Sequence, residues 1–210
     1  MNYYPVFLNL KGKRCVVIGG GKVAERKVKG LLEAGASVTV ISPVLTTELQ
    51  RLRDQKILTH LARQYQTGDL GDAFLVIAAT SDMEVNKQIF REASEIPLNV
   101  VDIPELCTFI VPSVIRKGPL IIAISTSGMS PALSRSLRLE LQEIIPDELS
   151  EFLEYLYNIR KEIKGKEGSG DILREIGSHR ILRVLINSGL EEAKREVRNI
   201  LRQKGFPHHT

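Results

Sequence analysis

Short apolar runs alternate with longer segments of helical periodicity over the first hundred residues. The runs are rich in Val, Ile and Leu, which is typical of buried strands. We expect strands at Cys15–Ile18, Ser37–Ile41, Ile57–Ala62, Phe74–Ala79 and Leu98–Val101. Helical spacing of apolar residues lies between them, from Val23 to Leu32, from Thr46 or Thr47 to Arg53, and over 83–94, with Val85, Ile89, Phe90 and Ala93 facing inward. The alternation predicts an α/β fold with a parallel sheet and right-handed crossovers.

The pattern changes after residue 108. Two β-rich runs, Phe109–Ile115 and Leu120–Ser125, flank a hairpin-type turn at Arg116–Pro119. Ser130 is a favourable N-cap residue followed by proline, so we expect a helix from there to about residue 145. Further helices are expected over 147–163 and 171–204. The glycine-rich segment Gly165–Gly170 between them predicts a flexible linker.

The most informative motif directly follows the first strand. From Gly19 the sequence reads Gly-x-Gly-x-x-Ala. Gly19 allows a tight turn, Gly21 lets the backbone approach a pyrophosphate, and Ala24 is small enough for close helix–strand packing. The free N–H groups and the partial positive charge of the helix start favour phosphate oxygens. Between a strand and a helix, this motif predicts a dinucleotide cofactor site.

Two further strand ends suit a ligand-binding edge. The second strand is followed by Ser42-Pro43, where many NAD-binding folds carry an acidic residue for the ribose hydroxyls. Because serine stands there, this position leaves the choice between NAD and NADP open. The fourth run ends in small and hydroxyl residues over Ala78–Asp82. Ligands of open α/β sheets bind at the carboxyl ends of the strands, so this segment is a second candidate for cofactor contact.

Composition narrows the class of protein. The chain has 210 residues and a formal net charge of +4, which is too small an excess to indicate nucleic acid and equally suits an anionic small molecule. The sequence contains no run of about 18 apolar residues, so no membrane span is expected. Met1–Pro5 lacks the basic start of a signal peptide. Two cysteines, Cys15 and Cys107, are too few for a disulfide framework. We therefore expect a cytoplasmic protein that binds neither nucleic acid nor membranes.

Taken together, the motifs resemble those of the precorrin-2 dehydrogenase and sirohydrochlorin ferrochelatase family, which forms the N-terminal half of sirohaem synthase. The matching segments are Tyr4–Leu8, Val17–Lys27, Leu32–Ala36, Ile77–Thr80 with Asn86, Asn99–Asp102, Phe109–Ser113 and Ser127–Pro131. They keep family order and near-family spacing over about residues 4–145, and their combination is highly specific. The helical C-terminus matches in character, and we expect the methyltransferase half of fused sirohaem synthases to be absent.

The resemblance implies a fold and a reaction. The fold is a Rossmann-like NAD-binding domain over 1–112, a dimerisation region with a β-hairpin over 113–146 and a helical C-terminal domain over 147–210. The reaction is NAD-dependent removal of a hydride and a proton from precorrin-2, which gives sirohydrochlorin. Some members also insert ferrous iron to give sirohaem. The substrates are anionic tetrapyrroles with many carboxylates, which gives the excess of Arg and Lys a use.

The same resemblance assigns roles to single residues. Cofactor contacts fall on Gly19, Gly20, Gly21, Lys22, Val23, Ala24, Ser42, Pro43, Val44 and Thr80. Asp102 stands where the family has its functional aspartate and is expected to act as the general base. Substrate contacts are expected from Asn99, Ser125, Thr126, Ser127, Gly128 and Ser130. Thr126 stands where some members have a serine that can be phosphorylated.

For each of these sites a structural role is the alternative. An aspartate at a strand end is often only a turn former or helix cap, and the hydroxyl-rich loop is also typical of a helix cap. No metal site is expected, because the histidines His60, His179, His208 and His209 have no ligand spacing with the cysteines. Cys107 is near enough in sequence to Asp102 to approach iron, although a lone cysteine does not make a site.

The sequence also predicts an oligomeric state and leaves two alternative functions open. The hairpin and the apolar face formed by Leu133, Leu137 and Leu141 would be exposed in a single chain, which with the resemblance predicts a homodimer. A nucleotide-sensing regulatory module, as in potassium channels, also opens with a Rossmann unit, but it is expected to carry an acidic residue after the second strand. A ferrochelatase-only protein with a vestigial cofactor fold is the other alternative.

Overall fold

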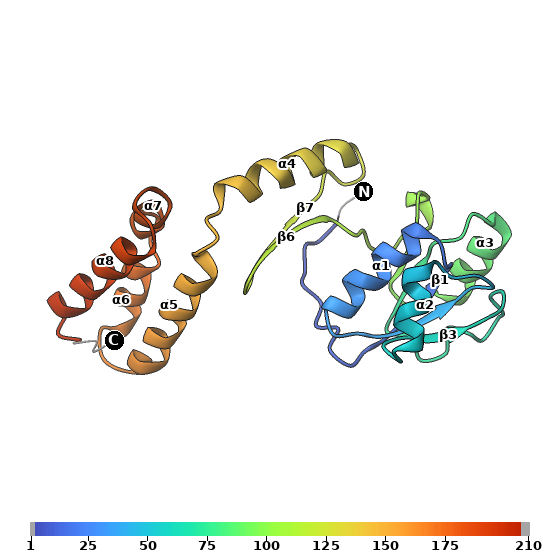
Figure 1. Ribbon diagram of the computed structural model, residues 1–210, viewed down its shortest axis with the longest axis horizontal. Coiled ribbons are helices and arrows are strands. Elements are labelled where there is room, and N and C mark those ends of the chain that lie inside the picture. The colour runs from blue at the N-terminus through green and yellow to red at the C-terminus, as the bar shows by residue number, and fades with distance from the viewer. Residues whose placement is uncertain (1–2, 207–210) are drawn as a thin grey trace. The chain divides into compact units, whose positions relative to one another are not determined.

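A computed structural model describes residues 3–206, and the chain forms two compact units, Met1–Val111 and Pro112–Thr210. The first unit contains a five-stranded parallel sheet in the order β3-β2-β1-β4-β5, and helices surround its strands in Figure 1. The strands are β1 (Arg14–Ile18), β2 (Ser37–Ile41), β3 (Thr59–Leu61), β4 (Leu75–Ala78) and β5 (Leu98–Val100), and the helices are α1 (Lys22–Glu33), α2 (Thr47–Asp54) and α3 (Met83–Glu92). This is the predicted α/β fold.

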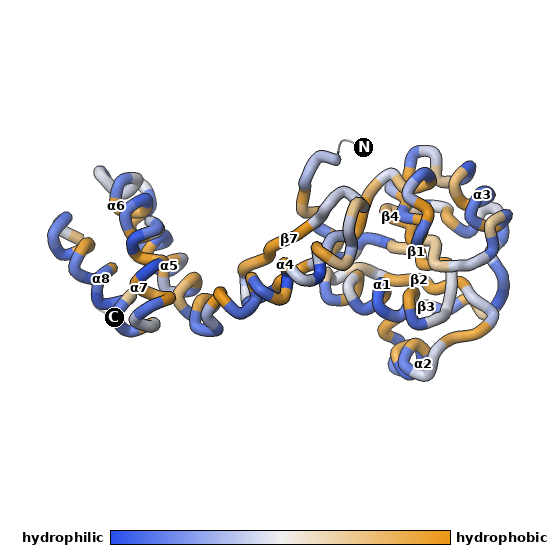
Figure 2. Tube along the Cα trace, turned by 90° about the horizontal axis from the view of Figure 1, so that it is seen from above, coloured by the Kyte–Doolittle hydropathy of each residue, from blue (hydrophilic) through white to orange (hydrophobic). Residues whose placement is uncertain are grey.

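Both faces of the sheet are covered, which explains why its strands are continuous apolar runs. Cys15 and Val17 of β1 lie in a core with residues of α1 and α2, whereas Val16 and Ile18 lie in a second core with residues of α3. Figure 2 shows the apolar character of the strands β1, β2 and β4. Burial raises the pKa of the Cys15 thiol to about 11, so Cys15 is a core residue, as predicted.

The order of the strands creates a crevice at their carboxyl ends. From β1 the chain moves outward to β2 and β3, and from β4 it moves the opposite way to β5. The direction therefore reverses between the neighbouring strands β1 and β4. At such a switch point the loops leaving the two strands diverge, and ligands of open α/β sheets bind there.

Two details of the first unit differ from the predictions. β3 is shorter than the predicted Ile57–Ala62, because it is an edge strand that pairs with β2 alone. Phe90 was expected to face inward but is 41% exposed. Ile89 and Ala93 fill the core side of α3, and Phe90 lies about 100° further round the helix from Ile89.

The second unit opens with an antiparallel hairpin of β6 (Ser113–Lys117) and β7 (Leu120–Ile124). The strand predicted at Phe109–Ile115 thus begins four residues later than expected, at Ser113. The reason is that Thr108 and Phe109 donate their N–H groups to the Leu98 carbonyl of β5. The turn is only Gly118-Pro119. Its positive φ of 54° at Gly118 suits the first position of a type II′ turn, whose twist matches that of the strands.

Helices complete the second unit. α4 (Pro131–Ile144) packs on the hairpin. The last four helices are α5 (Leu149–Ile163), α6 (Ser169–Ile176), α7 (His179–Ser188) and α8 (Leu190–Gln203), and they share one core. None of the helices within residues 3–206 has both the length and the apolar character that a membrane crossing requires.

The prediction of a flexible linker at Gly165–Gly170 is wrong. The segment is a tight turn in which Gly165 and Gly168 have positive φ angles of 87° and 74°, and α6 begins at Ser169. Ile172 and Ile176 are buried in the helical core, so the burial of these two side chains fixes α6 directly behind the turn. The glycines serve the turn, where positive φ is required.

Candidate functional site

The glycine turn lies at the switch point between β1 and β4. Gly19 has a φ of 119°, and a Cβ atom there would lie 2.3 Å from the carbonyl oxygen of Ala79. A Cβ atom on Gly20 would lie 1.9 Å from the carbonyl oxygen of Val44. On Gly21 it would meet nothing within 4 Å. The first two glycines are therefore required by close packing, and the third borders open space.

Backbone hydrogen bonds hold the loop after β2 against this turn. Thr46 donates its N–H to the Gly20 carbonyl over 3.0 Å, and Gly19 donates to the Ile41 carbonyl over 2.9 Å. Ser42 is buried, and its hydroxyl donates to the Val44 carbonyl over 2.8 Å. The predicted cofactor residues of the two loops are thus brought together, with Pro43 and Val44 exposed at the surface.

The start of α1 suits an anion. Gly21 is the N-cap residue, and no side chain caps the first turn. The N–H groups of the first turn, including those of Lys22 and Val23, point along the helix axis, where the helix dipole adds a partial positive charge. Ala24 is fully buried against the sheet. The open space beside Gly21 together with this uncapped helix start fits the pyrophosphate of a dinucleotide.

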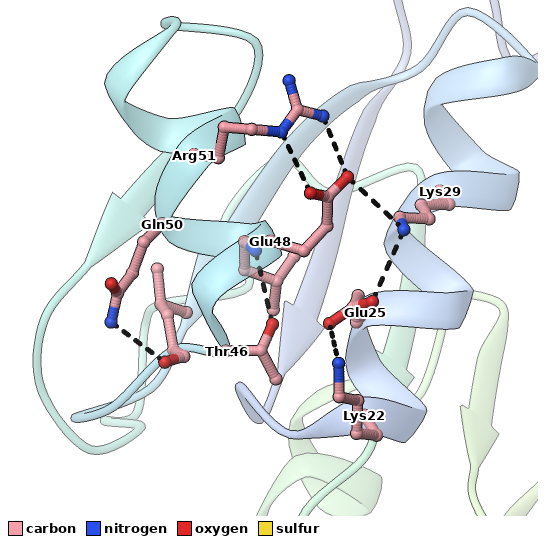
Figure 3. Close-up of polar contacts among 9 residues, drawn as sticks. Lys22, Glu25, Lys29, Thr46, Glu48, Gln50 and Arg51 are labelled. Atoms are coloured by element: carbon pink, nitrogen blue, oxygen red, sulfur yellow. Dashed lines mark hydrogen bonds and ion pairs between the residues drawn. The ribbon is translucent and has the colours of Figure 1, made fainter.

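A chain of charges joins α1 to α2 next to the glycine turn (Figure 3). Glu25 lies between Lys22 and Lys29, with N···O distances of 3.2 and 3.4 Å, and only 12% of its side chain is exposed. A hydrogen bond from Thr46, together with the two lysines, lowers the pKa of Glu25. This carboxylate in the first turn of α1 is therefore neutralised locally, which limits its repulsion of a phosphate at the helix start.

The chain of charges continues on α2. Lys29 also lies 3.4 Å from Glu48, and Arg51 donates to both oxygens of Glu48 over 2.9 Å. The hydrogen bonds from Arg51 lower the pKa of Glu48 to about 2. Thr46 caps α2 by accepting the N–H of Leu49. These contacts fix the start of α2, and with it the loop that packs on Gly20. Sequence analysis missed this network, whose signal is the i,i+3 and i,i+4 spacing of opposite charges.

The loop after β4 contributes Thr80, which is half-buried. Its hydroxyl accepts the N–H of Asp82 over 3.1 Å, and Asp82 caps α3. The Thr80 carbonyl accepts from the amide of Asn86, a residue that is only 1% exposed. Thr80 thus follows directly on Ala79, whose carbonyl contacts Gly19, and it stands at the same edge as the glycine turn.

Asp102 lies at the end of the next strand. It is exposed, follows β5 by two residues and has a φ of 62°, a left-handed conformation that aspartate tolerates better than most residues. The preceding residue, Val101, donates its N–H to the Ala78 carbonyl at the end of β4 over 2.9 Å. The predicted catalytic residue is therefore at the same carboxyl edge as the glycine turn, with β4 between the strands that carry the two.

Cys107 closes the turn that carries Asp102. Its sulfur lies 3.2 Å from the nitrogen and 3.2 Å from the carbonyl oxygen of Val100, and 3.3 Å from the carbonyl oxygen of Ile103. Burial raises the pKa of the Cys107 thiol. A neutral thiol that both donates and accepts hydrogen bonds accounts for Cys107 here, so the alternative of an iron-approaching thiolate loses its support.

Asn99, which the resemblance assigns to substrate contact, lies within β5 and is buried. Its amide nitrogen lies 3.0 Å from the carbonyl oxygen of Phe109 and 3.5 Å from the Cys107 sulfur. The visible contacts of Asn99 thus hold the returning segment 107–109 on β5. Its contact with substrate stays a prediction.

Lys27 on α1 received no role from the sequence. Burial and the neighbouring Arg26 lower the pKa of Lys27, while the charge of Asp102 acts in the opposite direction. The ammonium of Lys27 is thus within electrostatic reach of the Asp102 carboxylate. The signal in the sequence was a lysine directly beside Val28, a core position of the helix.

The predicted substrate loop belongs to the second unit, where it leads into α4. The Thr126 hydroxyl accepts the N–H of Ser130 over 2.9 Å and lies 3.2 Å from the Ser134 hydroxyl. Ser130 in turn caps α4 by accepting the N–H of Leu133. The Thr126 side chain thus connects the loop to the first turn of α4 through its hydrogen bonds.

The tip of this loop is open. Ser127 and Gly128 have φ angles of 54° and 84° and are exposed, as is Ser125, whose hydroxyl accepts the N–H of Ser127 over 3.0 Å. Exposed hydroxyls and N–H groups before the start of a fourteen-residue helix suit carboxylates. Among residues 3–206 no group of three or more His, Cys, Asp or Glu side chains is arranged to hold a metal ion, and His208 and His209 lie outside that range.

Comparison with known proteins shows which families and relatives the chain is similar to. Residues 6–113 match the family model described as putative NAD(P)-binding, and residues 117–144 match the model for the central region of sirohaem biosynthesis proteins. The chain is 40% identical over 220 residues to a sirohaem synthase of Methylobacillus flagellatus, covering 100% of this chain and 46% of the relative. It is 44% identical over 167 residues to a sirohaem synthase of Nitrosomonas europaea, covering 78% of this chain and 35% of the relative.

A solved structure agrees with these matches. The precorrin-2 dehydrogenase SirC superposes with a TM-score of 0.79 at 26% sequence identity, over 95% of this chain and 100% of that chain. The present chain spans less than half the length of the two sirohaem synthases. The NAD(P)-binding model covers the first unit, and the central model covers most of the hairpin and α4. The chain therefore belongs to the family of putative NAD(P)-binding proteins, and its hairpin and α4 are similar to the central region of sirohaem biosynthesis proteins.

Proposed function

We propose that the chain catalyses the NAD-dependent oxidation of precorrin-2 to sirohydrochlorin. The observation that carries the proposal is the placement of the open space beside Gly21 and the turn of Asp102 at the same edge of one sheet. A cofactor seated on the glycine turn would present its reactive end towards the neighbouring strand ends. A substrate held there would meet the Asp102 carboxylate.

When bound, NAD supplies the acceptor for the hydride that precorrin-2 loses. The residues of the chain then have separate tasks. Gly19–Gly21 and the start of α1 hold the pyrophosphate, and the Ser42–Val44 loop and Thr80 line the cofactor. Asp102 accepts the proton that leaves the macrocycle, so that the loss of one hydride and one proton completes the two-electron oxidation. A general base of this kind typically contributes about 10²–10⁴-fold to the rate.

We propose NAD rather than NADP as the cofactor. The segment after β2 is Ser42-Pro43-Val44, which offers no cation to a 2′-phosphate. The nearest arginine along the chain after β3 is Arg63, whose guanidinium is held by Asp69 over 2.6 and 2.8 Å. Calorimetric titration with both cofactors tests this choice, and tighter binding of NADP would contradict it.

We propose that the loop of Ser125, Thr126, Ser127, Gly128 and Ser130 contacts the anionic tetrapyrrole, and we propose substrate contact separately for Asn99 of the first unit. The exposed hydroxyls of Ser125 and Ser127 and the helix dipole of α4 suit the carboxylates on the rim of the macrocycle. Ferrous iron insertion is a second candidate activity, in which iron is a substrate. The observation that favours it is the exposed Asp102 carboxylate, which can also accept the pyrrole N–H protons that iron displaces.

We also propose a cytoplasmic homodimer. The cysteines Cys15 and Cys107 are both free thiols, as expected in a reducing compartment. In the single chain Leu133, Leu137 and Leu141 on α4 remain between 37% and 52% exposed. Apolar residues repeated along one face of a helix are typical of a protein interface.

Replacement of Asp102 by asparagine tests the function. The variant keeps the size of the side chain and its tolerance of positive φ but loses the base, so oxidation of precorrin-2 should slow by about 10²–10⁴-fold while NAD affinity is unchanged. The absorbance of sirohydrochlorin, and then of sirohaem with ferrous iron, reports the two activities. Asp54→Asn, a change at a surface ion pair on α2, is the control.

The outcomes separate the alternatives. Wild-type protein that binds NAD but leaves precorrin-2 unchanged would indicate a nucleotide-sensing module. Iron insertion without NAD binding would indicate a ferrochelatase-only protein. Equal rates for wild type and Asp102→Asn would show that Asp102 is a structural turn residue.

A further inference from the structure

Lys27 is a half-buried cation without an ion pair. Within the described part of the chain, the ion pairs made by α1 join Lys22 and Lys29 to Glu25 and Glu48, and none involves Lys27. The neighbouring Arg26 is also unpaired, but it is exposed and therefore solvated. Partial burial of an ammonium without a carboxylate partner is unfavourable, because the charge loses water and gains nothing in return.

The position of Lys27 on α1 directs it towards the turn of Asp102. Its helix neighbours Ala24 and Val28 are buried in the core that also packs against Val101 and Phe109. These two residues belong to the segment that carries Asp102. The charge of Asp102 acts on Lys27, yet no ion pair within 4.0 Å joins them. A cation and a carboxylate therefore lie within electrostatic range of each other without forming an ion pair.

The cofactor phosphates do not account for this cation. Lys27 lies six residues beyond Gly21, which is about 9 Å along the helix axis from the proposed pyrophosphate position. The start of the helix and Gly21 already provide for the pyrophosphate. The pyrophosphate therefore leaves Lys27 without an anion, and a second ligand at the Asp102 turn is the candidate to supply one.

We propose that Lys27 binds a peripheral carboxylate of the tetrapyrrole and thereby orients the macrocycle for Asp102. The inference rests on the proposed function and deepens it by naming a residue that selects the substrate. A carboxylate of the ligand forms a charge-assisted hydrogen bond with the Lys27 ammonium. The adjacent ring edge then lies beside Asp102, whose carboxylate remains free to accept a proton. Tetrapyrroles that lack the carboxylate at this position are expected to bind weakly.

Replacement of Lys27 by glutamine tests the proposal with two readouts. Fluorescence titration with sirohydrochlorin measures binding without turnover, and steady-state assays with precorrin-2 give KM and kcat. Affinity for sirohydrochlorin should fall about 10- to 100-fold in Lys27→Gln, as for loss of one hydrogen bond to a charged group. KM for precorrin-2 should rise more than kcat falls, and the Kd for NAD should be unchanged. Lys27→Arg, which retains the charge, should recover most of the affinity.

A control and a salt series separate a specific contact from general charge. Lys11→Gln makes the same chemical change at an exposed position just before β1, at the opposite edge of the sheet, and should bind sirohydrochlorin like the wild type. Raising ionic strength should weaken wild-type binding more steeply than binding by Lys27→Gln. If Lys27→Gln is poorly folded by circular dichroism, Lys27→Met, which retains the length of the side chain, replaces it.

The possible results are distinct. Weakened sirohydrochlorin binding in Lys27→Gln with unchanged NAD affinity supports the proposal. If Lys27→Gln binds sirohydrochlorin and turns over precorrin-2 as the wild type does, the proposed role of Lys27 is overturned and the proposed function remains intact. A loss of NAD affinity alone would assign Lys27 to the cofactor and likewise overturn the proposed role. Wild-type protein that binds no tetrapyrrole would overturn both the inference and the function on which it rests.

Discussion

The sulfur of Cys107 lies 3.2 Å from the backbone nitrogen and 3.2 Å from the carbonyl oxygen of Val100, the last residue of β5. A side chain thereby takes the place of a neighbouring strand at the point where the sheet ends. The turn between these residues carries Asp102 in a left-handed conformation. The hydrogen bonds of Cys107 hold the backbone on both sides of Asp102 and offset the cost of that conformation.

Replacement of Cys107 by valine should therefore reduce both stability and activity. Valine fills the space but leaves the Val100 N–H without its partner, which costs about 1–3 kcal/mol in the free energy of unfolding. The looser turn should also slow precorrin-2 oxidation, whereas NAD affinity should not change. Urea unfolding and the oxidation assay provide the measurements. Cys107→Ser, which retains a donor and an acceptor, is the matched variant and should lose less of both.

The three glycines of the turn should respond differently to substitution. Gly20→Ala places a methyl group 1.9 Å from the Val44 carbonyl oxygen, so it should displace the loop after β2 and destabilise the first unit by about 1–3 kcal/mol. Gly21→Asp has open space and should fold normally. Its carboxylate lies where the pyrophosphate approaches, so NAD affinity should collapse.

Thermal unfolding and calorimetric titration with NAD distinguish the two glycine variants. The expected pattern is a lower Tm for Gly20→Ala, and wild-type Tm without measurable NAD binding for Gly21→Asp. Unchanged NAD affinity in Gly21→Asp would remove the glycine turn from the cofactor site. A wild-type Tm in Gly20→Ala would show that the loop yields without cost.

The sheet was predictable because its inner strands are buried on both faces. In β1, β2 and β4 most residues are apolar and nearly all are buried, and a short run of this kind has few alternatives. The glycine turn was predictable for a similar reason, since close packing leaves no room for a side chain at Gly19 and Gly20. Spacing and residue type carry both signals locally.

Contacts between distant segments were beyond reach of local patterns. The segment Phe109–Ile115 has strand composition throughout, but its first residue donates its N–H to the carbonyl of Leu98, which stands eleven residues earlier. The role of Cys107 likewise depends on the backbone of Val100. Lys27 acquires its importance only from Asp102, which lies 75 positions further along the chain. No periodicity reports such pairings.

Acid should weaken the loop that precedes β4. Arg63 and the N–H of Gln66 donate to Asp69, whose side chain is only 8% exposed, and Arg63 lowers the pKa of Asp69. A carboxylate whose pKa is lower in the folded than in the unfolded state stabilises the folded protein. The full contribution is present when the pH is above the pKa of aspartate in the unfolded chain, which is about 3.9. This contribution is lost as the pH falls from there through the lowered pKa.

The pH effect is measured by urea unfolding at pH 7 and at pH 3. Asp69→Asn should destabilise the protein at pH 7, and the difference between variant and wild type should shrink at pH 3. Asp72→Asn provides a control, because the Asp72 side chain is 88% exposed and forms only a surface ion pair with Arg14. A difference for Asp69→Asn that is independent of pH would show that the lost contacts are not those of the charged form.

The last prediction concerns assembly through α4. Leu133, Leu137 and Leu141 are separated by four residues each and lie within about 80° of one another round the helix. In the single chain each is at least 37% exposed, so a partner that covers them removes a row of leucines from water. Leu137→Asp places a charge in the centre of that row and should therefore convert a dimer into a monomer at micromolar concentration. Leu139→Asp makes the same change roughly 200° round the helix from Leu137 and should leave the dimer intact. Multi-angle light scattering distinguishes one chain mass from two. A monomeric wild type would contradict the homodimer, and a monomeric Leu139→Asp would contradict the choice of this face.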